Sequence, residues 1–133
     1  MMMVADKLEF PATGDPMIDE DHAEFAEMVV KFETLADDEL APTMDALAKH
    51  LAEHFAREEK LMTKTGFPAY VIHKGEHERV LNWVASIKVQ LRAGDVAAVR
   101  EFLAKDVREW FVTHAATMDT ATANWARNRV LAY

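Results

Sequence analysis

The chain has 133 residues, a formal net charge of -8 and no cysteine. A chain of this length forms about one domain with a substantial buried core, and the absence of cysteine excludes disulfides, iron–sulfur clusters and thiol nucleophiles. Any bound metal ion must therefore be held by nitrogen and oxygen, and the acidic charge argues against nucleic acid or an anionic membrane surface as a partner.

The N-terminal segment "MMMVADKLEFPATGDP" contains an apolar run that is too short for a secretion signal. No stretch approaches the roughly 20 apolar residues of a membrane span. We therefore expect a cytoplasmic protein with no membrane insertion. The sequence shows no internal repeat and no strand pattern, and residues 1–133 are expected to form a single domain with a short N-terminal arm before the first helix.

The first predicted helix begins at Asp15 or Asp19, either of which can cap its N-terminus. It should end near "ADDEL" at residues 36–40. Apolar residues and one histidine recur with helical spacing on a single face. This face consists of Ile18, His22, Phe25, Val29 and Phe32.

The second predicted helix begins near Pro42 and is stopped by "TGFP" at residues 65–68. Within it, "REEK" at residues 57–60 is interpreted as a solvated face apart from Glu58. His50 lies off the apolar stripe and is interpreted as a partly exposed residue rather than a metal ligand. The inward stripe consists of Met44, Leu47, Leu51, His54, Glu58 and Leu61.

The third predicted helix runs from about Ala69 to Ala93, with Gly94 suited to its C-terminal cap and Asp95 to the next N-cap. Its inner side consists of Tyr70, His73, His77, Val80, Val84, Ile87 and Leu91. The last predicted helix continues to about Asn128, and its apolar face consists of Val99, Phe102, Leu103, Val107, Trp110 and His114. Long amphipathic helices with short connections predict an all-α, up-down-up-down four-helix bundle.

Histidines in apolar stripes are informative because imidazole is rarely buried without a partner. A single inward histidine is more often hydrogen-bonded to a neighbour than bound to metal, but several from different helices favour a metal site. The motifs H-x-x-x-E at His54 and H-x-x-x-H at His73 each place two ligands on one helix face. From His114 to Asp119 the spacing is about 140° on a regular helix, so this pair needs an inward lean or a local bulge.

This ordered set of ligands resembles the signature of the hemerythrin family, in particular its single-domain bacterial members. The flanking segments "IDEDH", "HFAREEKLM", "GFPAYVIHKGEH" and "WFVTHAATMD" agree with it, and the resemblance extends over about residues 8–129. It implies a di-iron site in the bundle core. The metal ligands that it implies are His22, His54, Glu58, His73, His77, His114 and Asp119.

By this resemblance, the histidines of the third and fourth helices hold one iron and those of the first and second helices hold the other. Glu58 and Asp119 bridge the two irons together with an oxo or hydroxo group. When these ligands are counted around two octahedral ions, one coordination position stays open. The single open position fits dioxygen as the ligand.

The resemblance implies reversible dioxygen binding for storage, delivery or scavenging, rather than catalysis. Neutral imidazoles favour iron(II), and the candidate walls of the oxygen pocket, Phe55, Trp110 and Phe111, offer no acid for cleaving an oxygen–oxygen bond. The alternative is a di-iron enzyme or sensor, such as a peroxidase-like or nitric oxide- or oxygen-responsive protein, and a zinc or manganese site also stays open. We expect a monomer, with a reductase or an oxygen-consuming enzyme as its protein partner.

Two departures from the family pattern concern the pocket rather than the ligands. Phe10 stands where the family often has tryptophan. Phe111 and Ala115 lie beside His114 where leucine and isoleucine are common. The shape of the oxygen pocket is therefore expected to differ from that of typical relatives.

Overall fold

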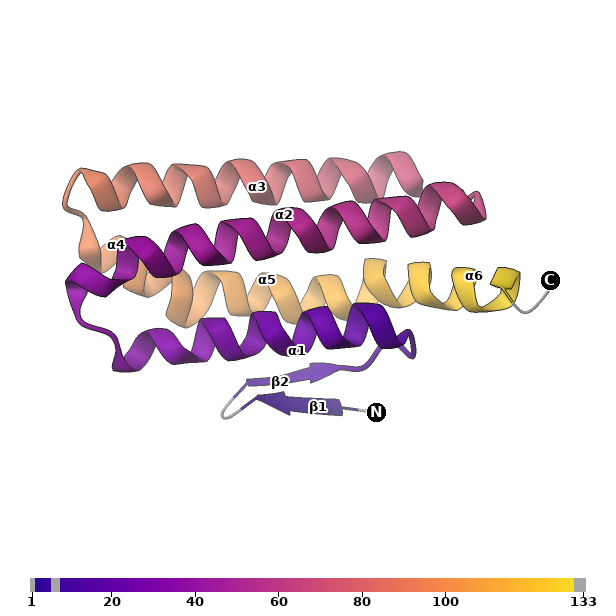
Figure 1. Ribbon diagram of the computed structural model, residues 1–133, viewed down its shortest axis with the longest axis horizontal. Helices are drawn as coiled ribbons and strands as arrows, with labels where there is room; N and C mark the ends of the chain where they lie inside the picture. Colours follow the sequence, from indigo (N-terminus) through magenta and orange to yellow (C-terminus); the bar gives the residue numbers. More distant parts are fainter. Residues whose placement is uncertain (1, 6–7, 131–133) are drawn as a thin grey trace.

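The structure, a computed structural model, describes residues 2–5 and 8–130, and long helices lie side by side along its longest axis (Figure 1). Helices α1 (Pro16–Lys31), α2 (Leu40–Thr65) and α3 (Tyr70–Arg92) are each continuous. The fourth helix, residues 96–130, is a composite of shorter segments. Successive helices run in opposite directions (Figure 1), which confirms the predicted up-down-up-down bundle.

The predicted caps occur at three of the helix ends. The carboxylate of Asp15 accepts from the backbone N–H groups of Met17 and Ile18, so Asp15 caps α1. Gly66 ends α2 with φ 67° and ψ 38°, a left-handed conformation that glycine adopts without strain. The Asp95 side chain accepts from the N–H of Ala98 at the start of the fourth helix.

Several predicted helix positions differ in detail from the structure. Helix α2 begins at Leu40, after the 3-10 turns η1 (Phe32–Thr34) and η2 (Asp37–Glu39), so Pro42 lies inside its first turn, where proline is tolerated. Met62, rather than Leu61, is fully buried near the C-terminus of α2. Tyr70 and Leu91, at the two ends of α3, are only half-buried.

An N-terminal β-hairpin lies against the bundle beside α1 (Figure 1). Strand β1 (Met2–Ala5) pairs antiparallel with β2 (Leu8–Pro11), with Met3 opposite Phe10. The expectation of no strand is therefore wrong, because strands of four residues contain too few alternations to stand out in a sequence. Leu8 and Phe10 are buried, and the Phe10 ring lies 5.2 Å from the ring of Phe111.

The fourth helix contains two π-helical segments. It consists of α4 (Val96–Glu101), the π-helical segment η3 (Phe102–Asp106), α5 (Val107–His114), the π-helical segment η4 (Ala115–Asp119) and α6 (Thr120–Val130). Segment η4 occupies the positions between His114 and Asp119, where the spacing of the two residues called for a local bulge. The other π-helical segment, η3, was not expected from the sequence.

The apolar stripes of the helices meet in one continuous core. Its largest fully buried apolar side chains include Phe10, Phe55, Phe102, Met44 and Leu103. Of the helices in the described part of the chain, none is both long enough and apolar enough to cross a membrane.

Candidate metal centre

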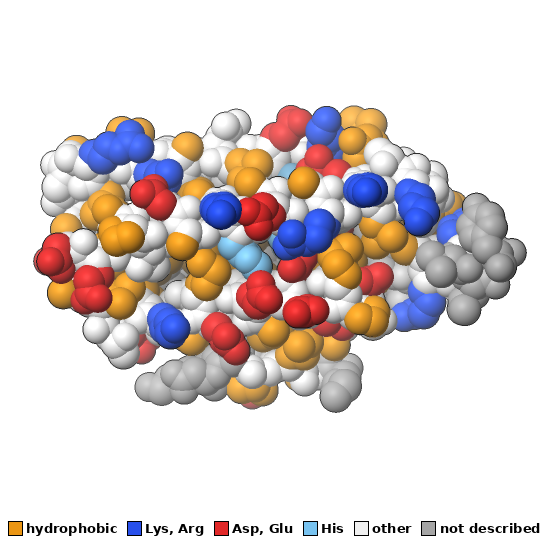
Figure 2. Space-filling model, viewed as in Figure 1, with side chains coloured by type: hydrophobic (Ala, Val, Ile, Leu, Met, Phe, Trp, Pro, Cys, Tyr) orange, Lys and Arg blue, Asp and Glu red, His pale blue; other side chains and the backbone are white. Residues whose placement is uncertain are grey.

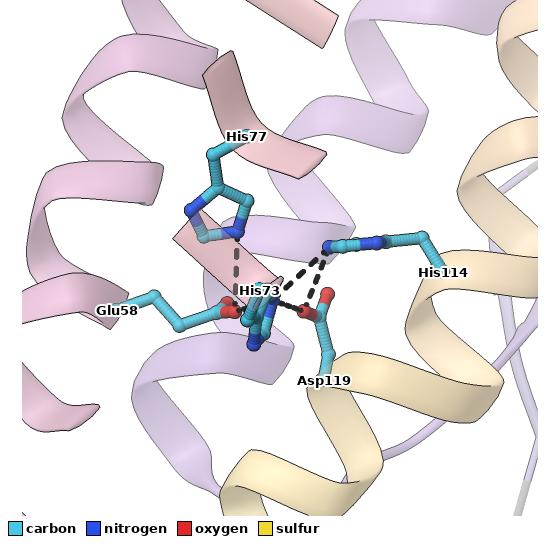
Figure 3. A group of neighbouring side chains, drawn as sticks. All are labelled: Glu58, His73, His77, His114 and Asp119. Carbon is cyan, nitrogen blue, oxygen red and sulfur yellow. Dashed lines mark hydrogen bonds and ion pairs between the residues drawn. The ribbon is translucent and has the colours of Figure 1, made fainter. Parts of the chain in front are cut away.

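The side chains predicted as metal ligands meet in the middle of the bundle. They come from α1, α2, α3, α5 and η4, and none is more than 5% exposed. Figure 3 shows five of them pointing toward one another from three parts of the chain. The complete cluster consists of His22, His54, Glu58, His73, His77, His114 and Asp119.

One half of the cluster brings three imidazoles to two carboxylate oxygens (Figure 3). Glu58 Oε1 lies 2.7 Å from His73 Nε2 and 3.5 Å from His77 Nε2. Asp119 Oδ1 lies 3.0 Å from the Nε2 atoms of both His73 and His114. The Nε2 atoms of His73 and His114 are 3.3 Å apart, so several donor atoms converge on one small volume.

The other half uses the remaining oxygen of each carboxylate. Glu58 Oε2 lies 3.0 Å from His54 Nε2, and Asp119 Oδ2 lies 2.8 Å from His22 Nε2. In each half, donor atoms of all the residues lie within 4.8 Å of one another. Each carboxylate therefore offers one oxygen to each of two neighbouring sites.

The donor set fits metal ions better than it fits a closed hydrogen-bond network. Among the described residues, both carboxylate oxygens of Glu58 and Nε2 of His77 are buried without a hydrogen-bond partner. A buried polar atom left unpaired costs about 1 to 3 kcal/mol, and a cation between these atoms would satisfy them. Imidazole nitrogen and carboxylate oxygen are ligands that suit iron and also zinc.

Ion pairs inside the cluster shift the pKa values of its members. Burial alone would lower the pKa of His54, but its hydrogen bond to Asp21 and the nearby carboxylate of Glu58 outweigh burial and raise that pKa to about 9. Burial also opposes the shift at His73, whose pKa rises to about 9 through Asp119 and Glu58. Burial and mutual repulsion would raise the pKa of Glu58, but its histidine partners lower it instead.

Three of the histidines are also held from outside the cluster through Nδ1. The His54 Nδ1–H donates to Asp21 Oδ2 at 2.8 Å, and the His77 Nδ1–H donates to Glu59 Oε2 at 2.9 Å. The His73 Nδ1 faces the Thr122 hydroxyl at 2.9 Å. Such partners fix the tautomer of a ligating histidine and direct its other nitrogen inward.

Sequence reasoning missed these outer partners. The interpretation of "REEK" as a solvated face holds for the exposed Arg57, although its guanidinium also donates to Asp21, but Glu59 is only partly exposed and accepts from His77. The only signal in the sequence was adjacency, since Asp21 directly precedes His22. Contact between residues far apart in the chain carries no spacing pattern, so the partners could be found only in the fold.

A small cavity of about 10 Å³ lies beside His22 and His54. This volume is close to the minimum that holds one water-sized molecule. Phe55, Trp110 and Phe111 are among its walls, and the ring of Phe111 meets that of His22 edge-on at 5.1 Å. The cavity therefore adjoins the half of the cluster that has only two imidazoles.

Stacking holds two of these aromatic walls against the cluster. The ring of Phe55 stacks on His77 with centroids 3.9 Å apart, and Trp110 stacks on His114 at 4.8 Å. His50 also lines the cavity but remains outside the cluster, since its Nε2–H donates to the backbone carbonyl of Asp21 at 2.9 Å. His50 is partly exposed, as predicted.

Comparisons with known proteins agree on one family. Residues 13–126 match the family model described as "Hemerythrin HHE cation binding domain". A bacteriohemerythrin of Ralstonia nicotianae is 29% identical over 116 residues, which cover 87% of this chain and 84% of that protein. A bacteriohemerythrin of Methylococcus capsulatus is 30% identical over 105 residues, which cover 76% of this chain and 79% of that protein.

The fold agrees as well. A crystal structure of hemerythrin, solved for a mutant with one leucine replaced by alanine, superposes with a TM-score of 0.80 at 27% identity, and the match covers 95% of this chain and 96% of that one. The family match spans the whole buried cluster of histidines and carboxylates. The chain belongs to the hemerythrin family.

Proposed function

We propose that this chain holds two iron ions in the buried cluster and binds dioxygen reversibly there, for storage, delivery or scavenging. The observation that carries this proposal is the division of the carboxylate oxygens. Glu58 and Asp119 each turn one oxygen toward one group of histidines and the second oxygen toward the other group. This arrangement suits two carboxylates that bridge a pair of metal ions.

In this proposal, His73, His77 and His114 serve one ion, and His22 and His54 serve the other. Two iron(II) ions would supply two electrons and an open coordination position for dioxygen. The cavity lies on the side with fewer imidazoles, where that position would be.

The walls of the cavity favour binding over bond cleavage. They are mainly aromatic and apolar, which limits the entry of water. In the described part of the chain, Asp119 is the only carboxylate that lines the cavity, and it is already a bridging ligand in this proposal. No further carboxylic acid among the described residues lines the cavity to protonate an oxygen atom, which supports an oxygen-binding protein rather than an enzyme.

We further propose that the protein acts as a cytoplasmic monomer with one hemerythrin-like domain. A reductase that returns oxidised iron to iron(II) would be its natural protein partner, because reversible binding ends once the iron oxidises. An oxygen-consuming enzyme would be the recipient in a delivery role.

The proposal predicts about two irons per chain and a reversible optical change, since donor atoms form two adjoining groups. Protein loaded with iron(II) under anaerobic conditions is exposed to oxygen, purged with argon and exposed again. We expect an absorption band that appears with oxygen, disappears on purging and returns in each cycle. One iron per chain, or zinc retained after growth in iron-rich medium, would contradict the di-iron assignment. Irreversible oxidation with turnover of an added peroxide or nitric oxide would favour the enzyme or sensor instead.

A further inference from the structure

One residue outside the ligand cluster joins three residues of α2. Asp21 accepts from the His54 Nδ1–H at 2.8 Å through Oδ2, and the backbone carbonyl of Asp21 accepts from the Nε2–H of His50. Arg57 donates to the same carboxylate through Nε at 3.0 Å and through Nη2 at 2.8 Å. Asp21 thus connects α1 to one face of α2, directly behind a predicted metal ligand.

The pairing of Asp21 with Arg57 reaches from the buried cluster to the surface. The side chain of Asp21 is 10% exposed, whereas that of Arg57 is 43% exposed. Figure 2 shows acidic and basic side chains intermixed near the middle of one face of the bundle, around a histidine. A change at Arg57 can therefore be made without opening a cavity in the core.

In the other half of the cluster, the carboxylate behind a histidine has a different environment from that of Asp21. His77 Nδ1–H donates to Glu59, whose side chain is 24% exposed. Within residues 2–5 and 8–130, Glu59 makes no ion pair with a lysine or arginine, so its negative charge has no cation beside it. The two halves therefore place different net charge behind their histidines.

A carboxylate behind a histidine accepts a hydrogen bond from its Nδ1–H. This bond increases the electron density of the ring and makes the inward nitrogen, Nε2, a stronger electron donor to a metal ion. A guanidinium that donates twice to the same carboxylate reduces this effect, because it withdraws negative charge from the carboxylate. The donor strength of His54 is then a balance between Asp21 and Arg57. His77 has the carboxylate alone.

We propose that Asp21 and Arg57 form a positioning pair that sets the orientation and donor strength of His54, and so tunes the ion beside the cavity separately from its neighbour. The inference rests on the proposed metal site, but its first test needs metal binding only, without oxygen. A failure of reversible oxygen binding would therefore leave it intact.

The first test compares Asp21→Asn with Glu59→Gln, a matched change behind the other half. Each amide can still accept the hydrogen bond but has lost the charge. Proteins loaded with cobalt(II) are mixed with an excess of chelator, and metal release is followed by absorption. Changes behind a ligating histidine typically cost about 10- to 100-fold in metal affinity. We expect each variant to release one of its two ions at least about tenfold faster than the unmodified protein.

The identity of the weakened ion is given by azide, a probe for an open coordination position. In iron-loaded protein, we expect the azide affinity to change in Asp21→Asn and to stay unchanged in Glu59→Gln. Equal changes in both variants would mean that Asp21 does not act on the half beside the cavity. Equal release kinetics in Asp21→Asn and unmodified protein would overturn the inference directly.

The second test uses the sign of the reduction potential. Asp21→Asn removes the donor-strengthening charge and should raise the iron reduction potential, whereas Arg57→Gln leaves the carboxylate unbalanced and should lower it. If Asp21 and Arg57 had a merely structural role, the reduction potentials of both variants would shift in the same direction. That result would refute the proposed balance between the two charges. If Asp21→Asn fails to fold, as judged by circular dichroism, Arg57→Gln decides the question alone, because the exposed Arg57 can be replaced without disturbing the core.

Discussion

Removal of the metal ions is expected to lower the melting temperature of the protein by more than about 10 °C. Among the described residues, three buried atoms that face the cluster, both carboxylate oxygens of Glu58 and Nε2 of His77, have no hydrogen-bond partner. At about 1 to 3 kcal/mol for each unpaired atom, the metal-free protein loses at least about 3 kcal/mol relative to the loaded one. For a domain of this size that corresponds to roughly 10 to 20 °C. Ions that bind only the folded state stabilise it further by mass action.

The difference in melting temperature between the loaded and the metal-free protein, here called the temperature gap, should widen as pH rises from about 6.5 to 9. In the metal-free protein, the raised pKa values of His54 and His73, about 9 for each, keep both rings protonated and paired with Asp21 and Asp119, respectively. The stability that these pairs contribute is fully present below the unfolded pKa of 6.5 and is lost as pH rises through 9. Ligating imidazoles are neutral, so the loaded protein lacks this loss.

Differential scanning calorimetry of chelated and reloaded protein at pH 6.5, 8 and 9 measures both effects. A His50→Ala variant is the control, because His50 lies beside the cluster without belonging to it, and this variant should keep the full gap. A His77→Ala variant should lose much of it. Equal melting temperatures with and without metal would show that the cluster is not a metal site.

The second large effect is expected at Phe111, where replacement by alanine should accelerate irreversible oxidation of the iron about tenfold or more, the equivalent of about 1.4 kcal/mol. The ring of Phe111 is 3% exposed, lines the cavity and lies 5.1 Å from His22. Phe10 and Phe25 hold this ring in place at 5.2 and 4.7 Å. Truncation removes an apolar wall and admits water beside the proposed open position. The variant should still hold both irons, bind oxygen and react faster with azide.

A matched control separates this effect from the loss of stability. Phe→Ala changes in a core cost about 3 to 5 kcal/mol, so Phe111→Ala will also melt earlier. Phe102→Ala removes the same side chain from another buried position, where Phe102 contacts Trp83. We expect the control to lose comparable stability with an unchanged oxidation rate. If both variants oxidise at the rate of the unmodified protein, Phe111 is ordinary core and the proposed gating is wrong.

The bundle and the inward positions of the cluster residues were predictable because one physical pattern encodes both. Residues that face the core recur at helical spacing whether they are apolar or polar, so His54 and Glu58 follow the same period as Leu47 and Leu51. The awkward spacing from His114 to Asp119 even indicated the position of η4. Turn residues with special backbone requirements, such as Gly66, marked the helix ends.

The remaining features depend on contacts across the fold. The hairpin exists because Leu8 and Phe10 find a buried surface on the bundle, and four-residue strands give no pattern of their own. From the sequence, Arg57 and Glu59 are expected to be solvent-facing charges. Only the fold shows that α1 and α3 place Asp21 and His77 beside them. The cavity, likewise, is a property of packed side chains from several helices.

The wide π-helical turn at η4 means that the buried residues before and after it do not follow one continuous 3.6-residue period. Phe111 and His114 before it, and Thr122 and Ala126 after it, are all buried. They share one buried face because the turn absorbs one residue, equivalent to about 100° of rotation. Deleting a single residue between His114 and Asp119 would let the turn close to a regular α-helix and leave Thr122 facing His73, whereas inserting one more residue there would rotate everything downstream by about 100°. For alignment or redesign, α5 and α6 are therefore best treated as two separate helices joined at η4.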